Sequence, residues 1–227
     1  MGGGPRPELQ GCPRSKVGYA AVMPTSKLGV GRSVILSFDD GPAPEAALRL
    51  ILATLAREQI TAEFYVIGAE VEKHPDAARS IVKFGHLLQN HSWSHPDLAK
   101  ASASVVLSEL SKTQAIIQST TGAKATRVRP PFGAGGWPGK LDPELASVAN
   151  RLSLKIQNWD IDTEDWKKPQ GVSSKYSAIR GQLERQPGKK TFQVLLHVQA
   201  ATARDLPDFI ATLRDWGFAF AKPGEVG

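Results

Sequence analysis

The sequence predicts an α/β fold, in which parallel strands alternate with helices within a single domain. Short apolar runs alternate with amphipathic helical segments about seven times along the chain, a pattern typical of a parallel sheet. No linker rich in Pro and Ser divides the chain into halves. Polar side chains that could act in catalysis or metal binding follow several of the strands directly, as they do at the C-terminal face of an α/β barrel.

The composition fits a globular protein and excludes several classes of function. Hydrophobic residues make up 41% and charged residues 22% of the 227 residues, and the net charge of +6 favours an anionic or wall-associated environment. No apolar run is long enough to span a membrane, and no Lys/Arg block with interleaved aromatic residues indicates nucleic-acid binding. The single cysteine, Cys12, cannot form an intramolecular disulfide.

The N-terminal part of the chain differs from the rest. Residues 1–32 are rich in Gly, Pro and Ser without a clear period, so we expect an irregular lead-in with room for one short strand. This segment also lacks the apolar stretch of a signal peptide. The folded domain is expected to span residues 33–227.

Strands are expected where branched and aromatic residues run together. The first, at 34–38, ends at two adjacent carboxylates, Asp39 and Asp40, which precede the turn signal Gly41-Pro42. A solvated Asp-Gly turn would give the same sequence. The later strands are expected at 63–67, just after Gly85, at 126–129, 154–159, 192–197 and 218–221.

Helices are expected between these strands, at 43–58, 75–84, 102–120, 143–152, 172–185 and 203–216. Gly85 follows the second of them in the position where glycine commonly ends a helix. The apolar residues that we expect to face the core are Leu48, Leu50, Ile51, Leu52 and Leu55 in the first helix, and Val105, Val106, Leu110, Ile116 and Ile117 in the third.

Two histidines and the two adjacent acids form a candidate metal site. His91 and His95 are four residues apart, so on a helical turn both imidazoles would lie on one face. Two unrelated surface histidines are the alternative. With Asp39 or Asp40 as a third ligand, the set matches a catalytic zinc site of two His and one carboxylate. The other carboxylate would then be free to act as a general base, and the residues alone do not choose between the two.

Arg129, Asp165 and His197 could complete the chemistry at neighbouring strand ends. A guanidinium beside a carboxylate keeps it ionised, so Arg129 could partner the base, although it could also be a surface arginine. His197 could be an ordinary core histidine, but pairing with Asp165 would raise its pKa and make it an acid near neutral pH. A base, an acid and a metal together suit hydrolysis of an amide or ester.

Aromatic side chains accompany these polar positions and could wall a pocket or pack in the core. They are Trp93, Phe132, Trp137 and Trp166.

Between residues 33 and 221 the chain resembles, in motif order, the polysaccharide deacetylases of carbohydrate esterase family 4. Five segments carry the resemblance, at 37–42, 91–95, 129–132, 162–166 and 195–197. The resemblance implies a distorted (β/α) barrel of about seven strands, with residues 33–227 as the catalytic domain. It also implies that Asp39 is the catalytic base and that Asp40, His91 and His95 bind the metal.

The same resemblance implies roles for the remaining residues. Arg129 would orient the base, Asp165 would tune the acid His197, and the backbone N–H of Phe132 would help to hold the oxyanion. Trp166 would line the substrate pocket and Leu195 would border the acetyl group. We expect Trp93 and Trp137 to contact substrate as well.

We therefore predict a metal-dependent hydrolase, with zinc as the expected ion, that removes N-acetyl groups from chitin oligomers or peptidoglycan N-acetylglucosamine. Such a substrate implies action outside the cytoplasmic membrane, in the periplasm, in the cell wall or as a secreted protein. The alternatives are an O-acetyl-polysaccharide esterase or small-molecule amidase on the same fold, and an inactive sugar-binding module. A non-haem iron oxygenase also uses two His and one carboxylate, but it leaves Arg129, Asp165 and His197 without roles.

Overall fold

The computed structural model describes residues 28–224, so most of the expected irregular lead-in lies outside the described part of the chain. Its centre is a sheet of eight strands, all paired in parallel. The strands are β1 (Ser33–Gly41), β2 (Glu63–Val66), β3 (Leu87–Asn90), β4 (Arg127–Val128), β7 (Lys155–Ile156), β8 (Ile161–Asp162), β9 (Thr191–His197) and β10 (Ala219–Phe220).

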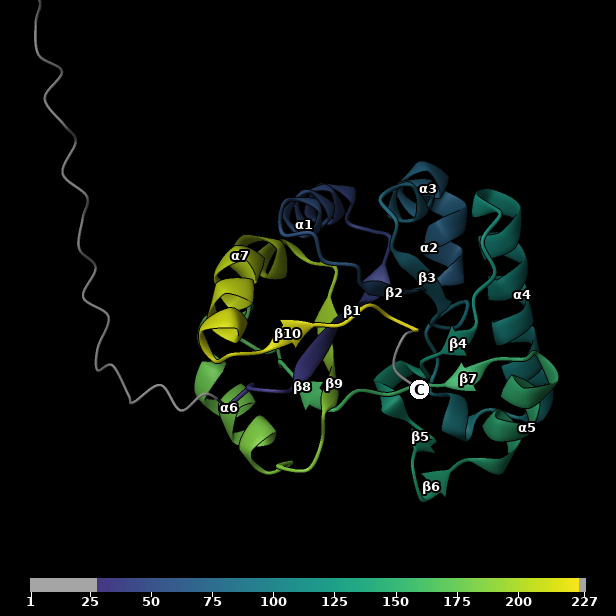
Figure 1. The fold of residues 1–227 in the computed structure, drawn as a ribbon. Coiled ribbons are helices and arrows are strands. Elements are labelled where there is room, and N and C mark those ends of the chain that lie inside the picture. The colour runs from purple at the N-terminus through teal and green to yellow at the C-terminus, as the bar shows by residue number, and fades with distance from the viewer. Residues whose placement is uncertain (1–27, 225–227) are drawn as a thin grey trace, which may run out of the picture.

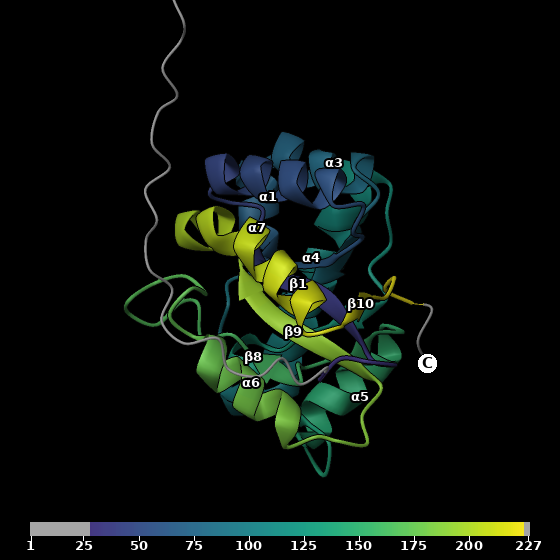
Figure 2. The same ribbon diagram turned by 60° about the vertical axis from the view of Figure 1, so that its left-hand side comes forward.

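The sheet curves into an open half-barrel. Its order is β7-β4-β3-β2-β1-β9-β8, and β10 pairs with the first residues of β1. The two outermost strands, β7 and β8, are the ends of this path, and the helices surround the sheet (Figures 1 and 2). The prediction of a distorted (β/α) barrel with about seven strands is confirmed.

The predicted helices are all present, with ends displaced by a few residues. They are α1 (Glu45–Arg57), α3 (Pro75–Lys83), α4 (Ala103–Thr121), α5 (Pro143–Arg151), α6 (Tyr176–Glu184) and α7 (Ala200–Asp215). None of the helices formed by residues 28–224 combines the length and apolar character needed to cross a membrane.

Several short elements were not predicted. They are the helix α2 (Gly68–Lys73), two single-turn helices at Leu98–Lys100 and Pro131–Gly133, the antiparallel pair β5 (Gly136–Trp137) and β6 (Lys140–Leu141), and β8. The expected strand at 154–159 is wrong in extent, because only Lys155–Ile156 is extended and paired. Elements this short make too few repeats of a hydrophobic period to be recognised.

Alternation along the strands separates an apolar face from a polar one. In β1, Val34, Leu36 and Phe38 belong to the core cluster packed under the helices, whereas Ser37 and Asp39 face the interior of the half-barrel. The interior is therefore unusually polar, and its polar side chains lead up to the carboxyl ends of the strands.

Two of the predicted core positions are wrong. Leu50 of α1 and Val105 of α4 are 60% and 45% exposed, while their neighbours Ile51 and Val106 are buried. A helical period of 3.6 residues leaves room for only three or four apolar positions in two turns, so adjacent apolar residues cannot all face the core.

Candidate active site

A bulge at the end of β1 brings two adjacent carboxylates to one place. Neighbouring residues of a regular strand point to opposite faces. Here the register between β1 and β2 slips between Phe38 and Gly41, and Asp40 has a left-handed φ of 65°. As a result, Asp39 Oδ2 and Asp40 Oδ1 lie 3.7 Å and 3.5 Å from the same nitrogen, His91 Nε2.

Asp40, His91 and His95 form a group that could hold a metal ion, with one donor atom of each within 4.8 Å of the others. Asp40 Oδ1 also lies 3.4 Å from His95 Nε2. The spacing suggested that the two histidines would lie on one helical turn, but they do not. They follow β3 in a loop in which Ser92 and His95 both have left-handed φ values, and this loop brings the two rings to 5.0 Å between centroids.

The surroundings favour the protonation states that bind metal. The backbone carbonyl of Arg129 accepts a hydrogen bond of 2.7 Å from His91 Nδ1, which leaves Nε2 free to coordinate. Burial would raise the pKa of Asp40, but the adjacent imidazole of His91 lowers that pKa overall. Burial lowers the pKa of His95, and the nearby His91 lowers it further.

An oxygen of Asp40 indicates whether these three residues suit a metal ion. Asp40 Oδ1 is buried, yet it has no hydrogen-bond partner within residues 28–224. A buried carboxylate oxygen without a donor is costly unless a cation takes that place. Two imidazoles and a carboxylate are also a donor set that catalytic zinc and non-haem iron sites use, so the residues fit a divalent metal.

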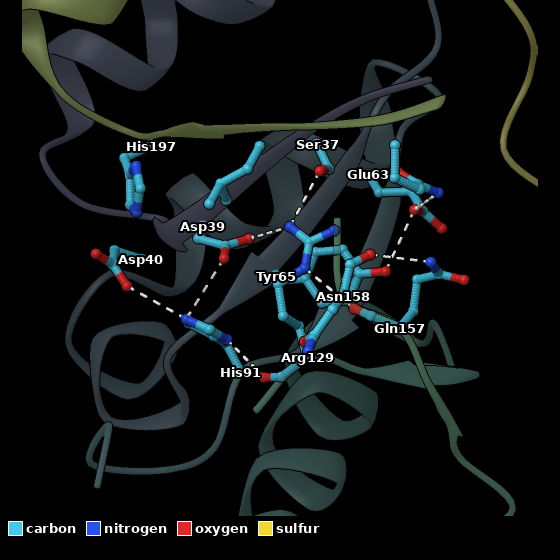
Figure 3. A network of polar contacts seen from close by, with 12 residues as sticks. Ser37, Asp39, Asp40, Glu63, Tyr65, His91, Arg129, Gln157, Asn158 and His197 are labelled. Carbon is cyan, nitrogen blue, oxygen red and sulfur yellow. Dashed lines mark hydrogen bonds and ion pairs between the residues drawn. The ribbon is translucent and has the colours of Figure 1, made fainter. Parts of the chain in front are cut away.

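Asp39 is held by a buried arginine (Figure 3). Arg129 Nη1 lies 2.6 Å from Asp39 Oδ1 and 3.0 Å from Ser37 Oγ, and its Nε donates to the carbonyl of Gln157. The guanidinium also lies over the Tyr65 ring at 4.0 Å. Burial alone would lower the pKa of Arg129, but the Asp39 carboxylate raises it overall, so the guanidinium stays charged.

A second polar layer lies behind this pair, inside the half-barrel. Glu63 is fully buried and pairs with Arg127 at 3.0 Å. It also accepts hydrogen bonds from Gln193 Nε2 at 3.0 Å and from the Tyr65 hydroxyl at 3.3 Å. Tyr65 thus connects the two layers, because its hydroxyl contacts Glu63 and its ring contacts Arg129. The sequence analysis assigned no role to Glu63, although a charged residue inside a predicted strand was a signal.

His197 and Asp165 lie on the other side of the cavity. Asp39 and His197 are partners in the register of β1 and β9, so the strand ends place them side by side. His197 Nδ1 lies 2.7 Å from Asp165 Oδ1, and Asp165 Oδ2 accepts from His197 N and from the hydroxyl of Thr202. Burial would lower the pKa of His197, but the hydrogen bond and charge of Asp165 raise it to about 9. The imidazole is therefore protonated at neutral pH.

These groups surround a cavity of about 440 Å³ at the carboxyl ends of the strands. Arg129 and Asp165 do not line this cavity, but their partners Asp39 and His197 do. The lining residues are Asp39, Asp40, His91, His95, Phe132, Trp159, Asp162, Trp166, Leu195 and His197.

Two of the aromatic residues expected at the site do not line the cavity. Trp93 packs near Gly68 of α2, where an added Cβ would lie 2.6 Å from its ring, and Lys112 of α4 lies 5.9 Å from that ring. Trp137 packs edge-to-face against Trp159, with 5.1 Å between the ring centroids, and is not among the residues that line the cavity.

Trp159 and Asp162 line the cavity although the sequence analysis did not choose them. Trp159 lies between β7 and β8, and Asp162 ends β8 and begins the motif at 162–166. Because the expected strand at 154–159 was too long, Trp159 was counted as a strand residue. Placing the strand end after Ile156 would have drawn attention to both positions.

Comparison with known proteins agrees with this geometry. The family described as polysaccharide deacetylase matches residues 28–156. A peptidoglycan-N-acetylglucosamine deacetylase, PgdA of Listeria monocytogenes, is 31% identical over 202 residues, which are 88% of this chain and 40% of that relative. The chitooligosaccharide deacetylase of Rhizobium leguminosarum bv. trifolii is 33% identical over 162 residues, which are 71% of this chain and 72% of the relative.

Among solved structures, a carbohydrate esterase family 4 pseudoenzyme from Bacillus anthracis superposes with a TM-score of 0.73 at 25% identity. That match covers 86% of this chain and 65% of the other. The chain spans about two fifths of the length of the Listeria relative. Because the family match extends over more than half of the residues, this chain belongs to the polysaccharide deacetylase family.

Proposed function

We propose that this chain is a metal-dependent hydrolase that removes N-acetyl groups from amino-sugar polymers, either peptidoglycan N-acetylglucosamine or chitin oligomers. The observation that carries the proposal is the meeting of three units in one cavity. These are the metal-ligand group, the carboxylate Asp39 held by Arg129, and the protonated His197 held by Asp165. The relatives named for peptidoglycan and chitooligosaccharide deacetylation support this substrate class.

Asp40, His91 and His95 would hold the ion, which we propose to be zinc. When bound, a divalent ion supplies Lewis acidity at the acyl group and to a nearby water. The other residues supply the proton transfers and the positioning.

Asp39 would accept a proton from the attacking water, because the hydrogen bond from Arg129 fixes the orientation of its carboxylate. His197 would give its proton to the amide nitrogen as the C–N bond breaks. Water thus adds its oxygen to the acyl carbon, and the products are acetate and a free amine on the sugar. The backbone N–H of Phe132 would donate to the carbonyl oxygen as it gains negative charge.

The apolar part of the cavity suits the methyl group of an acetamide. Leu195, which is buried, would border this methyl group, and the exposed Trp166 would contact the sugar ring. We assign no substrate contact to Trp93 or Trp137, since neither lines the cavity.

An inactive, sugar-binding role is the main alternative, since one structural relative is a pseudoenzyme. Binding alone does not require a paired acid, a paired base and a metal-ligand group in one cavity. We therefore favour catalysis. We also propose that residues 33–227 are the catalytic domain and that the chain acts outside the cytoplasmic membrane, where peptidoglycan lies.

The test is product analysis with the purified, zinc-loaded chain. N-acetylglucosamine oligomers should yield acetate and primary amine in equal amounts, and Asp39→Asn should bind zinc but release neither at a comparable rate. Acetate released only from O-acetylated polysaccharide would establish an esterase instead. A zinc-loaded chain that releases no acetate from any of these substrates would contradict the proposal.

A further inference from the structure

The loop that carries two of the candidate metal ligands is held in an unfavourable backbone conformation. It comprises residues 91–95, named here the histidine loop, and follows β3 without forming a helix. Ser92 and His95 have left-handed φ values of 66° and 63°. Residues other than glycine keep such values only where the surrounding structure holds them there. The positions of the two imidazoles therefore depend on the groups that bind this loop.

One side of the histidine loop is bound by α2, which packs beside α4 (Figure 1). The N–H groups of Gly68 and Ala69, at the start of α2, donate to the carbonyl groups of Ser92 and Trp93 at 2.9 Å and 3.0 Å. These bonds satisfy two carbonyl groups of the loop. The N–H groups in its centre need acceptors from elsewhere, because backbone N–H groups inside a protein are rarely left unpaired.

Glu109 of α4 supplies these acceptors. Its Oε2 accepts hydrogen bonds from the backbone N–H groups of Trp93 and Ser94, both at 2.8 Å. Its Oε1 accepts from the hydroxyl of Ser94 at 2.9 Å. Hydrogen bonds to a carboxylate are stronger than those between neutral groups. One side chain therefore binds both residues in the centre of the loop, between His91 and His95.

The histidine loop connects Glu109 to the metal site. The metal-ligand group consists of Asp40, His91 and His95, and Glu109 neither belongs to it nor lines the cavity. His95 follows the conformation of the loop directly, because its backbone N–H donates to Ser92 Oγ at 3.1 Å. A change in the centre of the loop would therefore move a ligand.

We propose that Glu109 is a positioning residue of the metal site, which holds the histidine loop in the conformation that presents both imidazoles to one ion. A loop that is already ordered loses less conformational freedom when an ion binds, so the affinity is higher. Without the carboxylate, the centre of the loop would lose three hydrogen bonds and its left-handed residues would relax. This inference rests on the proposed function, because it concerns the ion that this function requires.

The test is the zinc dissociation constant of the purified chain, measured without substrate by competition with a chromogenic chelator. Glu109→Ala should weaken zinc binding by about 10- to 100-fold, the usual cost of losing a group that orients metal ligands. Glu109→Gln can place its amide oxygen at the position of Oε2 and its NH₂ group against the Ser94 hydroxyl. It should therefore keep all three hydrogen bonds and stay within about threefold of the unmodified chain.

Asp205 offers a matched control, because it makes the same kind of contact at a loop without metal ligands. Its Oδ2 accepts from the N–H groups of Val172 and Ser173 at 2.9 Å and 3.1 Å. Asp205→Ala should therefore leave the zinc affinity unchanged. Ser94→Ala, at an exposed position, removes only the hydroxyl bond to Glu109 and should weaken zinc binding by about threefold. This second variant tests the inference even if Glu109→Ala does not fold.

Three outcomes would overturn the inference and leave the proposed function standing. They are unchanged zinc affinity in Glu109→Ala or Ser94→Ala, equal losses in Glu109→Ala and Glu109→Gln, and an equal loss in Asp205→Ala. The second would assign the effect to charge, and the third to general destabilisation. An unmodified chain that binds no zinc would overturn the inference and the proposed function together. Zinc binding without deacetylation would overturn the proposed function alone.

Discussion

The pairing of His197 with Asp165 leads to a quantitative prediction for Asp165→Asn. The carboxylate accepts hydrogen bonds from both the ring and the backbone N–H of His197, and it raises the pKa of the imidazole from 6.5 to about 9. An amide of the same shape can still accept a hydrogen bond but carries no charge. The pKa of His197 should therefore fall back to about 6.5, because burial lowers it and only the charges of Asp39 and Asp40 remain to oppose burial.

The magnitude follows from the protonated fraction of His197. A raised pKa keeps the imidazole protonated up to about pH 9, and activity that needs this proton is lost as the pH rises through that value. At pH 8 the protonated fraction falls from about nine tenths to about one thirtieth, so kcat should fall by about 30-fold in Asp165→Asn. At pH 5.5 both proteins carry the proton, and the two rates should be similar.

The assay is acetate release from the N-acetylglucosamine tetramer between pH 5 and pH 10. A bound divalent cation lowers the pKa of His197 in both proteins alike, so the displacement between the two profiles is the quantity to measure. The alkaline limb of Asp165→Asn should lie at lower pH than that of the unmodified chain. A loss of activity that is the same at every pH would refute the reasoning, because it would assign Asp165 a purely structural role.

Three further predictions concern the metal group, the buried ion pair and the packing of α2. Asp40→Asn should lose bound zinc by elemental analysis, whereas Asp39→Asn should keep it and lose about 10²- to 10⁴-fold in turnover. If both variants kept their zinc, the ligand assignment would be wrong. Arg129→Met leaves the buried Asp39 without its cation and should lower the free energy of unfolding by about 3–5 kcal/mol, measured with urea. A change below about 1 kcal/mol would mean that the pair is not buried in solution. Gly68→Ala would place a Cβ 2.6 Å from the Trp93 ring and from Thr113 Oγ1, and should cost about 1–3 kcal/mol in the same assay. An unchanged urea midpoint of unfolding would contradict the close packing of Gly68 against Trp93 and Thr113.

The major strands and helices could be predicted because their hydrophobic patterns are long enough to read. The run at 34–38 is buried throughout and forms the centre of β1. In contrast, β4, β7 and β8 are two residues long, so their position depends on pairing with neighbours and not on local pattern.

Most of the residues that line the cavity could be read from the sequence, Trp159 and Asp162 excepted, but their geometry could not. The bulge at Asp40 and the left-handed residues of the His91–His95 loop are backbone features that no spacing rule contains. The sequence left the roles of Asp39 and Asp40 open. In the structure, Asp39 contacts the Arg129 guanidinium and Asp40 lies close to both histidines, which supports the proposal that Asp39 is the base and Asp40 a metal ligand.

The buried Glu63 shows a different limit of sequence reasoning. A glutamate is almost never fully buried unless it is paired, and two of the partners of Glu63 are distant in the chain. Arg127 and Gln193 lie 64 and 130 residues away, and only the order of the sheet brings them together.

The most direct test of the account is a zinc titration of the metal-free chain, with acetate release from N-acetylglucosamine oligomers measured at each step. If the proposed metal-dependent mechanism is correct, activity should rise with bound zinc until one ion is bound per chain, and Asp40→Asn should gain neither zinc nor activity over the same range. Full activity in the metal-free chain, or bound zinc without any activity, would contradict it.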